Sequence, residues 1–212
     1  YKLAADMTAD EVGLPENQTS YITGEFTGML VGAEGSKAYA IYDLKKPLFD
    51  ILKNATVKDL DLKNTQVDSK ENAAAVAKTA NNATISNVAV EGKVSGRKSV
   101  AGLVVDATNT RIENSSFSGK LVANHADNNA NYAGGIVGKL TGGNAKVDKS
   151  KVDAVISTAA RNNNQTAGGI AGKLENGALV TRSVTTGKIL NGRGYSRIGG
   201  IVGSTYPRGR VD

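Results

Sequence analysis

The sequence contains no cysteine and no tryptophan, a single histidine, three prolines and few aromatic residues. Without cysteine the chain cannot form a disulfide, a thiolate zinc site or a cysteine nucleophile. Because aromatic side chains are scarce, any core must consist of Val, Ile, Leu and Ala. The scarcity of proline argues against a Pro-rich linker, and the 25 glycines favour short strands joined by tight bends.

Long apolar runs are also missing, since none approaches the ~18 residues of a membrane helix, and no charged-then-apolar signal sequence opens the chain. The net charge of +6 is graded: residues 1–50 carry eight acids against four bases, whereas residues 182–212 carry six bases against Asp212 alone. Such a gradient can attract an acidic partner, although a solvated surface explains it more simply. Because no nucleic-acid reader motif is present, we do not expect nucleic-acid binding. Because no long apolar run is present, we do not expect membrane insertion in this segment.

One glycine-rich motif recurs along the chain. It reads Ala133-Gly-Gly-Ile-Val-Gly-Lys-Leu140, Ala167-Gly-Gly-Ile-Ala-Gly-Lys-Leu174 and Ile198-Gly-Gly-Ile-Val-Gly203, with weaker copies at 101–105, 73–77 and 47–51. Its paired glycines predict sharp bends at which a Cβ atom is unwelcome. These glycines are Gly134, Gly135, Gly168, Gly169, Gly199 and Gly200.

A β-branched anchor follows each motif, at Val57, Ile85, Ile112, Val147 and Val180, with spacings of 28, 27, 35 and 33 residues. Around each anchor, apolar and polar residues alternate with the period of a strand. One unit of about three short strands cannot bury its own apolar face, whereas stacked units can. The sequence therefore predicts an all-β protein, a single-stranded parallel β-helix expected to be right-handed, with the five anchors forming one internal ladder.

Residues outside this repeat predict turns, loops and ends. A ladder of turn residues is expected because Asn tolerates the left-handed conformation, and its members are Asn54, Asn82, Asn109 and Asn144. Extra residues at 124–132, 157–166 and 191–197 are expected to project from one edge, which in repeat proteins is often the binding face. Residues 1–47 are predicted to form an N-terminal cap with entry strands, and 48–212 the β-helix, with further coils expected after Asp212.

The Gly-Gly-Ile-Val-Gly units resemble the GLUG motif of bacterial surface proteins. Further stretches resemble the region upstream of the protease domain in Gram-positive surface zinc metalloproteases of the immunoglobulin A protease family, namely Tyr1-Lys-Leu-Ala-Ala-Asp6, Phe26–Gly32, Ala40–Leu44, Pro47–Phe49 and Asn54–Leu60. This resemblance implies a secreted or cell-wall-anchored protein and a non-catalytic spacer or interaction module. The module would position the protease domain and contact a host glycoprotein, either an immunoglobulin or a mucin-like protein.

Catalytic chemistry in this chain is not expected. The family's His-Glu-x-x-His zinc signature is missing, because His125 is the only histidine, so zinc is expected only in a separate protease domain. The segments 134–139 and 168–173 resemble a phosphate-binding loop, but Leu140 and Leu174 stand where its Ser or Thr belongs. We therefore predict no catalytic, cofactor-binding or metal-binding residue.

Two other kinds of site stay open. Asp59 and Asp61 lie two residues apart and could face the same side of a strand, which leaves a carbohydrate-active β-helix enzyme as an alternative, and a glycan-binding adhesin domain is another. Five Asn-x-Ser/Thr sequons are interpreted as turn chemistry. The basic C-terminal end suggests partner-binding residues, which we predict to be Arg193, Tyr195, Arg197 and Arg208.

Overall fold

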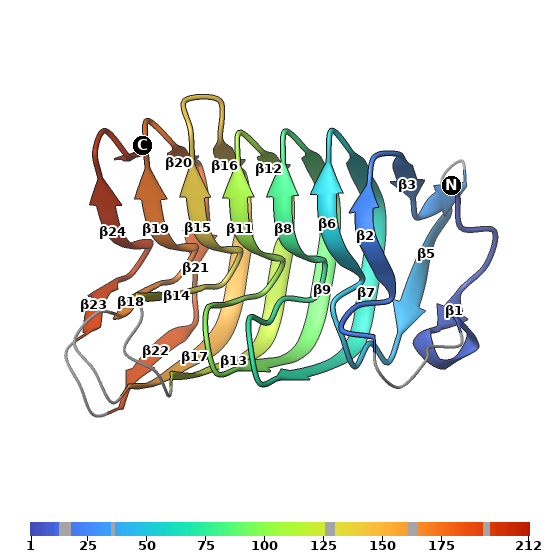
Figure 1. The fold of residues 1–212 in the computed structure, drawn as a ribbon, viewed down its shortest axis with the longest axis horizontal. Helices are drawn as coiled ribbons and strands as arrows, with labels where there is room; N and C mark the ends of the chain where they lie inside the picture. Colours follow the sequence, from blue (N-terminus) through green and yellow to red (C-terminus); the bar gives the residue numbers. More distant parts are fainter. Residues whose placement is uncertain (13–17, 35–36, 126–129, 161–164, 193–195) are drawn as a thin grey trace.

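A computed structural model of the chain describes residues 1–12, 18–34, 37–125, 130–160, 165–192 and 196–212. Within these residues the chain forms 25 strands and one short 3₁₀ helix, η1 (Ala9–Val12). The strands stack as a β-solenoid of about 6 turns, drawn from the N-terminus at one end to the last coil at the other (Figure 1). The predicted all-β, parallel β-helical fold is confirmed.

The first strand of every coil belongs to a seven-stranded parallel sheet of the described residues. Its strands follow one another along the rod (Figure 1) in the order β2 (Ile22–Phe26), β6 (Phe49–Lys53), β8 (Ala77–Asn81), β11 (Val104–Thr108), β15 (Val137–Thr141), β19 (Ala171–Glu175) and β24 (Val202–Tyr206).

Each coil then bends into a fourteen-stranded sheet, again counted over the described residues. Its strands are β1 (Met7–Thr8), β3 (Met29–Val31), β4 (Ala33–Glu34), β5 (Lys37–Tyr42), β7 (Thr56–Ser69), β9 (Thr84–Gly96), β12 (Arg111–Glu113), β13 (Ser116–His125), β16 (Lys146–Asp148), β17 (Lys151–Ala160), β20 (Leu179–Thr181), β21 (Val184–Thr185), β22 (Lys188–Asn191) and β25 (Arg210–Val211). A four-stranded sheet completes the coils with β10 (Val100–Ala101), β14 (Asn131–Gly134), β18 (Gln165–Gly168) and β23 (Ser196–Gly199).

The five anchors lie directly above one another. Val57 pairs with Ile85, Ile85 with Ile112, Ile112 with Val147 and Val147 with Val180 as Cα partners in parallel strands. All five are at most 1% exposed, so the ladder forms the inside of the stack. Two more residues extend the same ladder, Leu30 below Val57 and Val211 above Val180.

The asparagines that precede the anchors occupy a turn with a left-handed backbone. Asn54, Asn82 and Asn109 have φ values between 47° and 51°. The prediction for Asn144 is wrong, because it is not among the residues with positive φ and Gly142, with φ 108°, occupies the aligned position. This turn is two residues longer than the turn of the preceding coil, so Gly142, and not Asn144, is the residue that directly follows the strand end at Thr141.

A second left-handed corner divides the long strands of the fourteen-stranded sheet. Its residues have φ values between 47° and 54° and are Asp59, Asn87, Asn114, Lys149 and Arg182. The Asn87 amide donates a hydrogen bond to Asp59 Oδ1 at 2.8 Å across one coil. Asp59 thus lies at a bend and not within a regular strand alternating with Asp61. Three sequon asparagines, Asn54, Asn82 and Asn114, lie at these two kinds of turn.

Strand stacking begins before residue 48. Two strands of residues 1–47, β2 and β3, pair in parallel with strands of the next coil: β2 pairs with β6, and β3 pairs with β7. β1 and η1 lie beside β5 at the end of the rod (Figure 1). The proposed boundary between cap and β-helix at residue 47 stays a prediction, and the first coil already contributes strands to two of the sheets.

The glycine pairs lie where each coil passes from the four-stranded to the seven-stranded sheet. A Cβ atom on Gly135 would lie 2.3 Å from the carbonyl oxygen of Gly169, and one on Gly169 would lie 2.1 Å from that of Gly200. Neither glycine has a positive φ. Close approach of the next coil, and not backbone conformation, therefore requires glycine here.

Candidate functional site

The three inserts start and end at one edge of the solenoid. They connect β13 to β14, β17 to β18 and β22 to β23, that is, the fourteen-stranded sheet to the four-stranded sheet. Their ends are in register, since Asn131 pairs with Gln165 and Gln165 with Ser196. The central residues 126–129, 161–164 and 193–195 lie outside the described residues. We refer to the described flanks of these inserts as the insert edge.

Polar side chains are buried beneath the insert edge. Asn131, Thr158, Gln165 and Thr166 are between 2% and 4% exposed. Within the described residues, the Gln165 carboxamide and the Thr166 hydroxyl have no hydrogen-bond partner, although both are shielded from solvent. Buried polar groups in native proteins are normally hydrogen-bonded, often to ordered water. The interior beneath this edge is therefore partly polar, in contrast to the anchor ladder.

Tyr132 links the insert edge to the neighbouring seven-stranded sheet. Its ring lies 5.8 Å from Lys139 Nζ and 5.6 Å from Lys173 Nζ, within the range of cation–π contacts. Asp106 and Glu175 approach the same lysines, with Nζ to carboxylate distances of 3.7 Å and 2.5 Å. This cluster of one ring, two ammonium groups and two carboxylates was not apparent from the sequence, because its members come from three coils.

Burial and ion pairing shift the pKa values of two residues in this cluster, Asp106 and Lys173. Burial raises the pKa of Asp106 above its ordinary value, even though Lys139 opposes the shift. The hydrogen bond to Glu175 raises the pKa of Lys173, because it favours the charged ammonium. The cluster is close to charge balance and fixes the position of Tyr132 at the foot of an insert.

The four predicted partner-binding residues do not form one described patch. Arg193 and Tyr195 lie outside the described residues. Arg197 is exposed on β23, where it pairs with Thr166 across one coil. Arg208 is exposed in the turn between β24 and β25 and has φ 61°. These two arginines therefore lie on different elements of the last coil, separated along the chain by β24.

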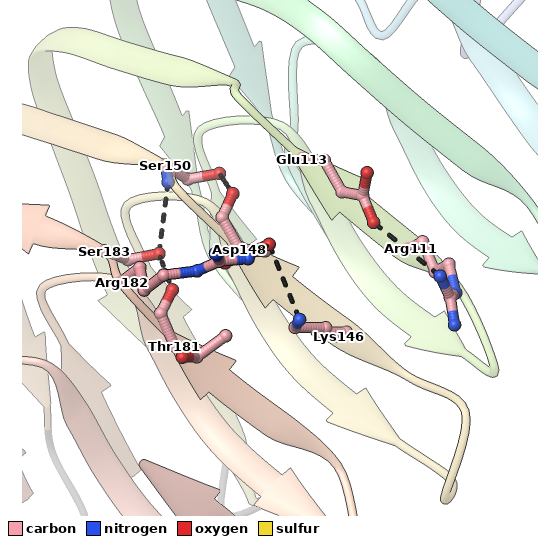
Figure 2. Close-up of polar contacts among 8 residues, drawn as sticks. All are labelled: Arg111, Glu113, Lys146, Asp148, Ser150, Thr181, Arg182 and Ser183. Atoms are coloured by element: carbon pink, nitrogen blue, oxygen red, sulfur yellow. Dashed lines mark hydrogen bonds and ion pairs between the residues drawn. The ribbon is translucent and has the colours of Figure 1, made fainter. Parts of the chain in front are cut away.

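The outer corner of the late coils carries an ion pair between a buried carboxylate, Asp148, and an exposed guanidinium, Arg182 (Figure 2). Arg182 Nε donates to Asp148 Oδ1 at 2.8 Å, and a second guanidinium nitrogen contacts Oδ2. Lys146 Nζ lies 3.5 Å from Asp148 Oδ2. Asp148 is only 6% exposed, and its hydrogen bond with Arg182 holds its pKa below the usual range. This contact joins two successive coils by charge.

A serine ladder runs inside the same corner. The Ser115 amide donates to Ser150 Oγ at 3.4 Å, and the Ser150 amide donates to Ser183 Oγ at 3.1 Å (Figure 2 shows the second contact). Each hydroxyl in turn donates to a carbonyl two residues earlier, as Ser150 Oγ does to Asp148 O at 3.0 Å. At this corner, serine hydroxyls therefore accept hydrogen bonds from backbone amides of the neighbouring coil, where regular strand pairing is interrupted.

Catalytic arrangements considered from the sequence find no support in the described residues. The motif lysines Lys139 and Lys173 lie in strands and pair with carboxylates, so neither belongs to a strand–loop–helix phosphate site. Asp59 and Asp61 contact Lys58 and Lys63 at 3.9 Å and 3.8 Å. The side chain of His125 lies outside the described part of the chain.

Metal binding and membrane insertion can be examined over the same described residues. No group of three or more His, Cys, Asp or Glu side chains among them could hold a metal ion. The described chain also contains no helix long and apolar enough to span a membrane. The zinc signature of the resembled family has no counterpart in these residues.

The sequence is similar to a known family of metallo-endopeptidases and to two streptococcal proteases. Residues 1–92 match a family model described as the M26 IgA1-specific metallo-endopeptidase N-terminal region. The chain is 69% identical over its full length to the zinc metalloprotease ZmpC of Streptococcus pneumoniae serotype 4. It is 46% identical, over 98% of its length, to an immunoglobulin A1 protease of Streptococcus sanguinis.

The solved structure of an IgA1 protease also matches this fold. It superposes with a TM-score of 0.90 at 39% sequence identity, over 95% of this chain and 16% of that one. The chain spans only 11% of the length of each of the two sequence relatives named above. The similarity therefore concerns one region of much longer proteins.

Proposed function

Because this chain belongs to the N-terminal region of the M26 IgA1-specific metallo-endopeptidase family, we propose that it is a non-catalytic β-helical spacer and interaction module. Its parent would be a secreted or cell-wall-attached metalloprotease. The module holds the protease domain at a fixed distance and contacts a host glycoprotein, an immunoglobulin or a mucin-like protein, along the insert edge.

The continuous stack is the observation that carries this proposal. One aliphatic ladder runs from Leu30 to Val211, so each described coil packs directly on the next along the stack. Repeat stacks of this kind transmit position along their axis because each unit contacts only its neighbours. Zinc and the catalytic base belong to another domain of the parent, since this chain has only one histidine.

Removal of one coil from the full-length protease tests the spacer role. Deleting residues 103–135 joins Gly102 to Ile136, and register is kept because Ala101 pairs with Gly134 and Val104 with Val137. We expect cleavage of the glycoprotein substrate to fall at least about tenfold, while hydrolysis of a short peptide is unchanged. Equal rates on both substrates before and after the deletion would reject a spacer role.

Replacement of the predicted contact residues tests the interaction role. Changing Arg193, Tyr195, Arg197 and Arg208 to Ala should weaken glycoprotein binding by the purified chain, measured by surface plasmon resonance. The control changes Lys93 and Lys120 to Ala, which are exposed on β9 and β13 at another face. Unchanged affinity in the first variant, or an equal loss in both, would remove these residues from the contact.

A carbohydrate-active enzyme is the competing function, and it requires turnover by this chain alone. The purified chain is incubated with glycans and with immunoglobulin, and the products are examined by mass spectrometry. We expect intact substrates. Cleavage that persists in repeated preparations would reject the non-catalytic module.

A further inference from the structure

One corner of the fourteen-stranded sheet changes the sign of its charge along the rod. In three later coils it consists of the aligned residues 111–116, 146–151 and 179–184, here called the basic corner. It holds five bases against two acids, whereas the aligned residues 56–61 hold one base against two acids and 84–89 hold no charge. We propose that the basic corner binds a linear anionic glycan, whose sulfate or carboxylate groups pair with these bases.

The bases of the basic corner come from three coils and are Arg111, Lys146, Lys149, Lys151 and Arg182. Arg111 and Lys146 are Cα partners in adjacent coils, and Lys149 and Arg182 hold the left-handed position of adjacent coils. Because adjacent rungs are about 4.8 Å apart, the charges form two short rows along the rod. The insert edge follows the far ends of β13, β17 and β22, so this surface is separate from it and the proposal does not rest on the proposed function.

The acids of the basic corner are more shielded than its arginines. The side chain of Asp148 is 8% exposed and contacts the guanidinium of Arg182, whose side chain is 58% exposed (Figure 2). The side chain of Arg111 is 60% exposed and lies 3.9 Å from a Glu113 oxygen, beyond hydrogen-bond distance. Solvent at this corner therefore contacts mainly guanidinium and ammonium groups.

Two lysines of the basic corner, Lys149 and Lys151, are exposed and form no ion pair within the described residues. By contrast, Lys58, the one base of residues 56–61, lies 3.9 Å from an Asp59 oxygen. Ammonium groups without a carboxylate partner on an ordered sheet keep their full charge available to an external anion.

The backbone conformation of Lys149 also points to an external anion. Its φ is 47°, and Asn87 and Asn114 hold the same left-handed position in the two preceding coils. Asn suits this conformation because its short polar side chain can hydrogen-bond locally, whereas a lysine has no such advantage. Arg182, the next residue in the row, contacts Asp148. Lys149 has no comparable contact within the described chain, so an external anion explains a base at a position that favours Asn.

A glycan suits this surface better than an acidic protein segment or a nucleic acid does. Protein interfaces are anchored by aromatic or aliphatic side chains in packed hollows, and single-stranded nucleic acids stack their bases on aromatic rings. The basic corner holds no aromatic residue, and polar Asn114 and Ser116 lie one rung from two of its lysines. Sulfate and carboxylate groups along a sugar chain need only the charge-assisted hydrogen bonds that Arg and Lys provide.

Substitution by the residues of the preceding coil tests this surface and preserves the stack. Each of three bases takes the residue one rung below it: Arg111→Thr after Thr84, Lys149→Asn after Asn114 and Lys151→Ser after Ser116. We expect the triple variant to bind a heparin decasaccharide at least about tenfold more weakly at low ionic strength, measured by isothermal titration calorimetry. Its Tm should be unchanged or higher, because Asn adopts positive φ more readily than Lys.

The matched control removes three exposed bases of the early coils, with Lys70, Lys93 and Arg97 changed to Ala. An equal loss of heparin affinity in this control, or no heparin binding by the unaltered chain, would overturn the proposal. Polyglutamate of equal charge is the second ligand, and we expect it to bind more weakly than heparin. Equal affinity for polyglutamate, with the same loss in the triple variant, would replace the glycan with an acidic protein segment. A lower Tm for Lys149→Asn alone would show that Lys149 is structural and would also refute the proposal.

Discussion

The early coils (47–112) and the late coils (131–212) build the same bend from different residues. In the early coils Ala74, Ala101 and Val105 are fully buried and form a small apolar cluster of their own. In the late coils Gly134 occupies the place of Ala101, and Gly138 that of Val105. A Cβ on Gly134 would lie 1.9 Å from the Val137 carbonyl oxygen.

This difference shows that one bend can be built either with small and β-branched side chains or with glycine. Where small side chains separate the four-stranded and seven-stranded sheets, the coils are short and carry no insert. Where glycines let the backbones touch, β14 packs on β15 and β19, and each coil carries an insert. Close backbone packing thus lies at the base of every insert, and Tyr132 adds a side-chain contact there.

Ile112→Asp breaks what both regions share, the anchor ladder. Ile112 is fully buried between Ile85 and Val147, so an unpaired carboxylate there costs several kcal/mol. We expect loss of cooperative thermal unfolding measured by circular dichroism. Thr108→Asp, on an exposed position of β11, is the control and should retain the transition. A folded Ile112→Asp protein with wild-type Tm would contradict the ladder.

Gly169→Ala separates the coils with glycine at this position, Gly102 included, from the earlier coil that has Ala75. A methyl group there meets the Gly200 carbonyl and the Thr185 side chain at 2.1 and 2.6 Å, and overpacking costs about 1–3 kcal/mol. The aligned Ala75 of the early coils already carries a Cβ, so Ala75→Gly should also destabilise, by about 1 kcal/mol. Urea unfolding measures both. Stabilisation by Gly169→Ala would contradict the close backbone approach at Gly169, and stabilisation by Ala75→Gly would contradict the packing of the Ala75 side chain.

The sequence predicted the repeat and its direction of stacking because aliphatic residues recur at equivalent places. Val57 and Ile112 could be aligned without any structure, since each follows a turn residue and begins an alternating strand. Asn144 was misplaced because its turn gained two residues, and spacing alone cannot show which residue takes the left-handed position. Gly142 took it, since glycine adopts positive φ without strain.

Contacts between coils were harder to predict than the coils themselves. Tyr132 contacts two lysines, one in its own coil and one in the next, and no local pattern pairs a ring with distant ammonium groups. Asp148 and Arg182 are 34 residues apart and meet only because insert lengths set the register of the late coils. The partner-binding prediction was based on charge alone, which does not show that Arg197 lies in β23 and Arg208 in the turn after β24.

Ser150→Ala tests the serine ladder, which only the late coils possess. The early coils have Leu60 and Val88 at this position. Removing the Ser150 hydroxyl leaves the buried amide of Ser115 without its acceptor, at a cost of about 1–2 kcal/mol. Urea unfolding should show this loss, and faster hydrogen exchange should be confined to the amide of Ser115 and its neighbours. Unchanged stability and exchange would show that water replaces the hydroxyl.

Asp148→Asn tests the charge contact between late coils and should have the smallest effect at neutral pH, a Tm lower by about 2–4 °C. The pKa of Asp148 is lowered in the folded state by Arg182, so its stabilisation is present above the ordinary carboxyl pKa near 3.9. That stabilisation is lost as pH falls through the folded pKa. The difference in Tm between wild type and Asp148→Asn should therefore shrink as pH falls below about 4.

Asp106→Asn is the matched control, because the pKa of Asp106 is raised by burial in the folded protein. A raised carboxyl pKa contributes stability that is present below about 3.9 and is lost as pH rises through the folded pKa. The neutral amide should therefore raise Tm slightly at pH 7 and have less effect in acid. Parallel pH profiles for Asp106→Asn and Asp148→Asn would contradict the opposite pKa shifts of these two carboxylates, one half-buried beside Lys139 and one hydrogen-bonded to Arg182.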